Sequence, residues 1–148
     1  MSEYETDILL WSEHQAALLR RVAAGERINN AELDWPNIID EVETVGRNEL
    51  HAVESLLVQT LLHILKARAW PLSAAVPGWQ KEIRVFRMQL RRRFVPSMRQ
   101  KIDLADLYAE ALLSLPDMID SQPPLPVPDF CTVTLDELLS EPPHTQLR

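Results

Sequence analysis

Apolar residues recur every three or four positions along most of the chain, which is the period of an amphipathic α-helix. The first run begins after Asp7, a residue type that caps helices, and closes at Gly25. A longer run extends from Pro36 to about Ala69, and its apolar stripe passes through Gly46 without a change of phase. The pattern predicts one long helix here, with a bend or a break at Gly46 as the alternative, because glycine disfavours helix interiors.

Two further amphipathic runs follow in the second half of the chain. Pro77 fits the first turn of a helix, and the apolar face that it opens ends near Phe94. Asp103 is placed to cap another helix, which reaches about Leu115 before Pro116 interrupts it. We therefore predict four main helices.

The C-terminal part has a different composition. Residues 122–133 include four prolines within six positions, which favours an extended strap over a helix. A short helix is predicted at 134–140 and a frayed tail at 141–148. The sequence thus predicts an all-α, single-domain helical bundle over residues 1–148, with a core at about 4–121.

Length and composition fit a globular domain better than a disordered chain or a membrane protein. The chain has 148 residues, of which 46% are hydrophobic and 25% charged. The apolar runs are too short and interrupted to cross a bilayer, which takes about 20 residues. The acidic N-terminus lacks the basic start of a secretory signal, and a lone Cys131 fits a reducing compartment. We therefore expect a cytoplasmic protein.

Glu41, Glu43 and His63 are the candidates for catalysis or metal binding, since carboxylates and imidazoles on facing helices can hold a metal or exchange protons. Their spacing matches no helical metal motif. The competing interpretation makes the carboxylates a solvated face and His63 a hydrogen-bonded core residue. The pattern predicts no cofactor and indicates no particular metal, and it favours a protein without catalysis over a metal-binding or hydrolytic enzyme.

Charge is distributed unevenly along the chain, whose net charge is −7. Residues 81–101 contain eight basic residues and one acid, so the remainder carries −14. Arg84, Arg87 and Arg91 share one helical face, and with Trp79 they form a possible interaction face. Nucleic-acid binding is a second alternative, but the acidic remainder and the lack of interleaved aromatic residues weigh against it.

Several stretches carry a family likeness, namely YETDILLW, LDWPNIIDEVETVGRNE, LLHILK, VPSMRQ and DFCTVTLDELL. In order and spacing, from about Tyr4 to Leu139, the chain resembles a bacterial family known as domain of unknown function 29, DUF29. The resemblance implies an all-α fold and no established activity, cofactor or catalytic residue. The positions that match the family pattern include Trp11, Asp34, Trp35, Glu41, Glu43, Gly46, Arg47, Glu49, His63, Lys66 and Trp79.

The absence of a catalytic constellation favours a small protein-interaction or scaffold domain. We expect a protein partner or self-association through an exposed helix face, with no membrane partner.

Overall fold

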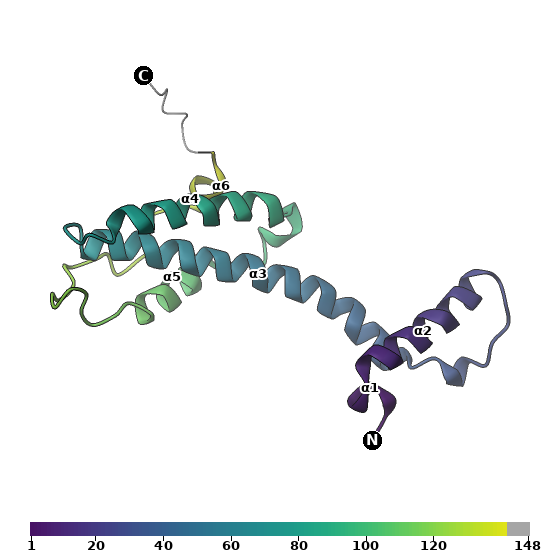
Figure 1. The fold of residues 1–148 in the computed structure, drawn as a ribbon. Helices are drawn as coiled ribbons and strands as arrows, with labels where there is room; N and C mark the ends of the chain where they lie inside the picture. Colours follow the sequence, from purple (N-terminus) through teal and green to yellow (C-terminus); the bar gives the residue numbers. More distant parts are fainter. Residues whose placement is uncertain (142–148) are drawn as a thin grey trace. The chain divides into compact units, whose positions relative to one another are not determined.

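The computed structural model describes residues 1–141, and their regular structure is helical, with no strand. This confirms the predicted all-α fold with four main helices (Figure 1). The predicted tail from 142 to 148 lies outside the described residues. Within residues 1–141, no helix combines the length and the apolar content that a bilayer span requires. The α-helices are α1 (Glu3–Thr6), α2 (Ile8–Ala23), α3 (Trp35–Ala69), α4 (Val76–Arg93), α5 (Leu104–Leu113) and α6 (Leu135–Leu139).

The chain divides into two compact units, Met1–Asn48 and Glu49–Arg148. The first contains α1, α2, a 3₁₀ turn at Asn30–Glu32 and the start of α3, and the second contains the rest of α3 and all later elements. Helix α3 is continuous through Gly46, as the unbroken phase of its stripe predicts. The single domain predicted for 1–148 stays a prediction.

Local signals at both ends of α2 form the predicted caps. The Asp7 carboxylate accepts a hydrogen bond from the backbone N–H of Leu10 at 3.0 Å. Past the other end of the helix, Gly25 has φ +85°, a left-handed conformation that glycine adopts without steric cost. The sequence pattern missed α1, a single turn whose capping box pairs Ser2 with Glu5.

In the second unit, the C-terminal part of α3 lies between α4 and α5 (Figure 1). Glu49 pairs with Arg93, and His63 contacts Glu82, so α3 and α4 run antiparallel. The core is built from side chains of every helix in this unit. It comprises Val53, Leu57, Val58, Leu61, Leu62 and Leu65 of α3, Leu90 of α4, Leu107, Tyr108 and Ala111 of α5, and Leu138 of α6, together with Met98.

The proline-rich strap is extended, as predicted, and is attached to the end of α3 and to α5. The N–H of Leu125 donates to the carbonyl oxygen of Ala69 at 2.9 Å, and the indole N–H of Trp70 donates to that of Gln122 at 2.9 Å. The Tyr108 hydroxyl donates to the carbonyl oxygen of Pro128. These hydrogen bonds, together with Val127 and Val133, which pack against the core, hold the strap on the rest of the second unit.

Candidate interaction site

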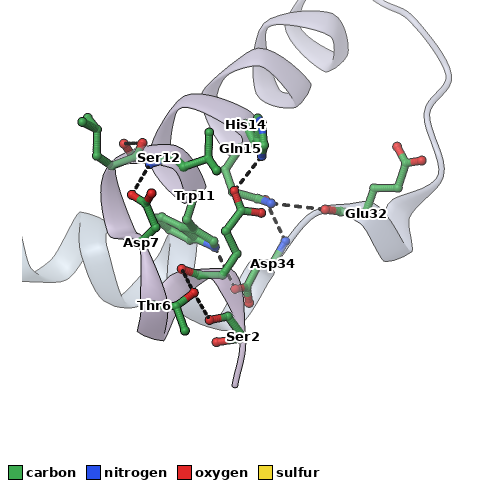
Figure 2. Close-up of polar contacts among 12 residues, drawn as sticks. Ser2, Thr6, Asp7, Trp11, Ser12, His14, Gln15, Glu32 and Asp34 are labelled. Atoms are coloured by element: carbon green, nitrogen blue, oxygen red, sulfur yellow. Dashed lines mark hydrogen bonds and ion pairs between the residues drawn. The ribbon is translucent and has the colours of Figure 1, made fainter.

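The start of α3 is fixed to α2 by a polar network (Figure 2). The buried Trp11 donates its indole N–H to the carboxylate of Asp34 at 3.0 Å, and the side-chain oxygen of Gln15 accepts from the Asp34 N–H at 2.8 Å. The Asn37 amide also donates to this carboxylate, at 2.7 Å. Chiefly through the Asn37 bond, and with help from Trp11, the pKa of Asp34 is held below its usual value.

Glu41 belongs to the same structural arrangement. The hydroxyl of Tyr4 donates to the Glu41 carboxylate at 2.6 Å, and the Tyr4 ring meets Trp11 edge-on with centroids 4.8 Å apart. This hydrogen bond is the main reason why the pKa of Tyr4 is raised to about 12. In this unit Glu41 thus serves as the acceptor that holds α1 against α3.

The other carboxylate candidate, Glu43, lies on the exposed side of α3. Arg47 contacts Glu43 at 3.3 Å and Asp40 at 3.1 Å, and all three side chains are about half exposed. Glu41 and Glu43 lie about six turns before His63 on the same helix. Among the described residues, no group of three or more His, Cys, Asp or Glu side chains is placed to hold a metal ion.

His63 is buried in the contact between α3 and α4. Its Nδ1 lies 2.7 Å from the carbonyl oxygen of Gln59, which only accepts hydrogen bonds. Its Nε2 faces the Glu82 carboxylate, and Phe86 meets the imidazole edge-on at 5.4 Å. These contacts make His63 part of the packing between α3 and α4, which is the role of a hydrogen-bonded core residue.

The arginines of α4 fall into two groups. Arg87 donates to the carbonyl oxygens of Leu138 at 3.1 Å, Glu137 at 2.9 Å and Ser140 at 2.7 Å, which lie at the C-terminal end of α6. Arg91 also reaches Ser140, at 3.3 Å. The last carbonyls of a helix lack the backbone N–H partners that earlier ones have, so the two guanidinium groups bind them and fasten α6 to α4. Burial, followed by the charge of Arg91, lowers the pKa of Arg87.

The second group of cations faces solvent. Lys81, Arg84 and Arg92 are exposed and have no ion-pair partner among residues 1–141. The apolar Val85 and Met88 lie between them and are also exposed. Trp79 is half-buried, with the Lys66 ammonium 6.0 Å from its ring. Of the four predicted interaction residues, Arg84 therefore points away from the fold, whereas Arg87 and Arg91 bind α6 and Trp79 packs against Lys66.

A surface that the sequence pattern did not predict lies on the N-terminal part of α3. The stripe is fully buried at Val53 and Leu57. In the first unit the same helix leaves Ile39 54%, Val42 70% and Val45 67% exposed. We call Trp35, Ile39, Val42 and Val45 the uncovered α3 face. Burying such a face would contribute about 25 cal/mol for each Å² of apolar surface removed from water.

A small cleft of about 210 Å³ lies in the second unit, at the end of α3. It is lined by Trp70, Leu72, Ser73 and Leu125, among others, and Asp120 closes one side with its carboxylate bonded to the Ser73 hydroxyl. Asp120 and the next residue have positive φ angles, which non-glycine residues rarely adopt. No motif in the sequence indicates this cleft, because it depends on how the strap meets α3.

Comparison with known proteins gives the family. The family model described as "Domain of unknown function DUF29" matches residues 3–142. The chain belongs to the DUF29 family. No curated protein matches the chain. A solved structure, an alpha-helical protein of unknown function from Rhodospirillum rubrum ATCC 11170, is similar over 95% of this chain and 91% of its own, with 23% identity and a TM-score of 0.62. At this identity the likeness shows a shared helical fold.

Several of the positions that match the DUF29 pattern build the first unit and the α3–α4 contact. Trp11 and Asp34 bond to each other, Glu41 anchors Tyr4, and His63 faces Glu82. The pattern therefore identifies residues that hold helices together, and the comparisons indicate no specific activity.

Proposed function

We propose that the protein is a cytoplasmic protein-interaction module without catalysis of its own, and that it binds its partner through the uncovered α3 face. One observation supports this most directly: a single apolar stripe is buried at Val53 but exposed at Ile39 and Val42. Contiguous exposed apolar surface costs solubility, and it commonly marks a site where another protein binds. The single cysteine supports the choice of a reducing compartment.

The residues beside this face are suited to a protein partner. Arg47 offsets one of the two negative charges of Asp40 and Glu43, so the rim of the face is polar and weakly negative. An apolar centre with a polar rim is the usual arrangement of a protein interface. Trp35, a residue type that is often important for binding energy, stands at one end of the face.

Site-specific crosslinking tests this proposal in the cells that naturally produce the protein. A photo-crosslinking amino acid at Val42 is expected to form a protein adduct in high yield. The same amino acid at Asn48, an exposed polar position on the same helix, serves as the matched control and is expected to form little. Adding Ile39→Asp to the Val42 probe should abolish the adduct, because a buried carboxylate without a partner opposes docking. Equal yields at both positions, unaffected by Ile39→Asp, would contradict the proposal.

A further inference from the structure

A second uncovered face lies on α4. Lys81, Val85, Met88 and Arg92 follow one another at intervals of four, three and four residues. Val85 is 38% and Met88 39% exposed. We call these four residues the α4 face. Residues at such intervals line up in a seam along one side of a helix, and the two apolar ones, Val85 and Met88, can pack against a matching pair on another helix.

Three residues of the uncovered α3 face, followed by Gly46, have this same sequence of intervals. Trp35, Ile39, Val42 and Gly46 also lie four, three and four residues apart. When the two seams are aligned in parallel, Ile39 meets Val85 and Val42 meets Met88. Trp35 then lies opposite Lys81, where an ammonium group can sit over the indole.

The acidic charge of the first unit is complementary to the cations of the α4 face. Residues 1–48 contain four basic and ten acidic residues, a net charge of −6. The exposed side of α4 instead presents three cations without an ion-pair partner among the described residues. In the parallel alignment, Glu43 flanks the α3 seam and Arg84 flanks the α4 seam at positions that form salt bridges between paired helices.

We propose that the uncovered α3 face of one copy packs in parallel against the α4 face of a second copy, with Glu43 of one opposite Arg84 of the other. This inference rests on the proposed function and names its partner. The matching spacing of the two seams, their apolar residues and their opposite charges all favour a second copy as the partner. A nucleic acid would match only the cations of α4. A helix pair of this length buries less than a standard interface, so the association is weak and reversible.

Charge exchange tests the contact with purified full-length protein. Sedimentation equilibrium of the wild type is expected to give a mass that rises with concentration. Glu43→Lys and Arg84→Glu should each weaken this self-association about tenfold, because each puts like charges opposite one another. An equimolar mixture of the two variants should restore it, since each then presents the charge that the other lacks. A variant that merely folded poorly would not be rescued by mixing.

Two controls complete the experiment. Glu13→Lys, at an exposed position of α2, makes the same charge change as Glu43→Lys and should leave the self-association unchanged. Short DNA and RNA duplexes at low salt should show no binding that depends on Arg84, and such binding would favour a nucleic-acid partner instead. A wild type that stays monomeric at every concentration, or a mixture that fails to associate, would overturn the inference. If the purified protein stays monomeric but the Val42 probe still crosslinks to a different protein, the proposed function stands and only the self-association is wrong. If the Val42 probe forms no adduct either, the proposed function and the self-association both fail.

Discussion

The buried imidazole of His63 faces the carboxylate of Glu82 across the contact between α3 and α4. Because Nδ1 is held by the Gln59 carbonyl oxygen, Nε2 has Glu82 as its remaining polar partner in the described residues. The contact thus links the antiparallel helices α3 and α4 and gives the buried imidazole a polar partner. Among the residues that match the DUF29 pattern, His63 is the clearest case of one that stabilises the packing of two helices.

Removing the carboxylate is expected to destabilise the second unit. In Glu82→Ala the His63 ring loses its partner, and a buried polar group without a partner costs about 1 kcal/mol where water can partly replace it. Urea unfolding followed by circular dichroism measures this change. Gln80→Ala, at an exposed position of the same helix, is the matched control and should change the unfolding free energy little. Equal stability of the two variants would show that the pair contributes nothing.

The attachment of α6 depends on Arg87. Arg87→Ala removes charged hydrogen bonds to three carbonyl oxygens, and we expect a loss of about 2 kcal/mol. The effect should be local, so hydrogen exchange of the α6 amides is the measurement, and their protection should fall. Arg84→Ala, one turn earlier and exposed, is the control. Unchanged exchange in α6 would mean that Leu138 holds the helix through apolar contacts alone.

Alkaline titration reports on the link between Tyr4 and Glu41. Since the pKa of Tyr4 is raised to about 12, its protonated form is favoured in the folded chain. The stabilisation is complete below the unfolded pKa of about 10 and is lost as the pH rises toward 12. Ultraviolet absorbance should therefore show tyrosinate appearing later in the folded than in the denatured chain. Glu41→Gln should lower the Tyr4 midpoint, while Tyr108, whose pKa is raised by burial, should keep its own.

Sequence predicts the helices well because the signals that begin and end them are local. Asp7, Asp103 and Thr134 each accept a hydrogen bond from a backbone N–H a few residues away, so the pattern alone identifies them as caps. The contacts of Arg87 with residues about 50 positions away depend on how helices pack, which periodicity does not specify.

The exposure of the α3 stripe is a second feature that periodicity does not specify. Ile39 and Val53 have the same phase in one stripe, yet one is 54% exposed and the other fully buried. Periodicity states which side of a helix is apolar, but burial also requires another element to cover that side. The candidate interaction site therefore became apparent only from the structure.

Gly46 provides a test of whether α3 is a rigid helix. It lies in the helix interior, and a Cβ built at this position meets no atom within 4 Å. Gly46→Ala should therefore raise the free energy of unfolding by about 1 kcal/mol, because alanine loses less backbone entropy in a helix. Thermal unfolding by circular dichroism measures this gain. Gly25→Ala is the contrasting control and should lower stability, since φ is +85° there. If Gly46→Ala instead lowers stability or weakens self-association, the glycine is needed for bending or for close approach of a partner helix.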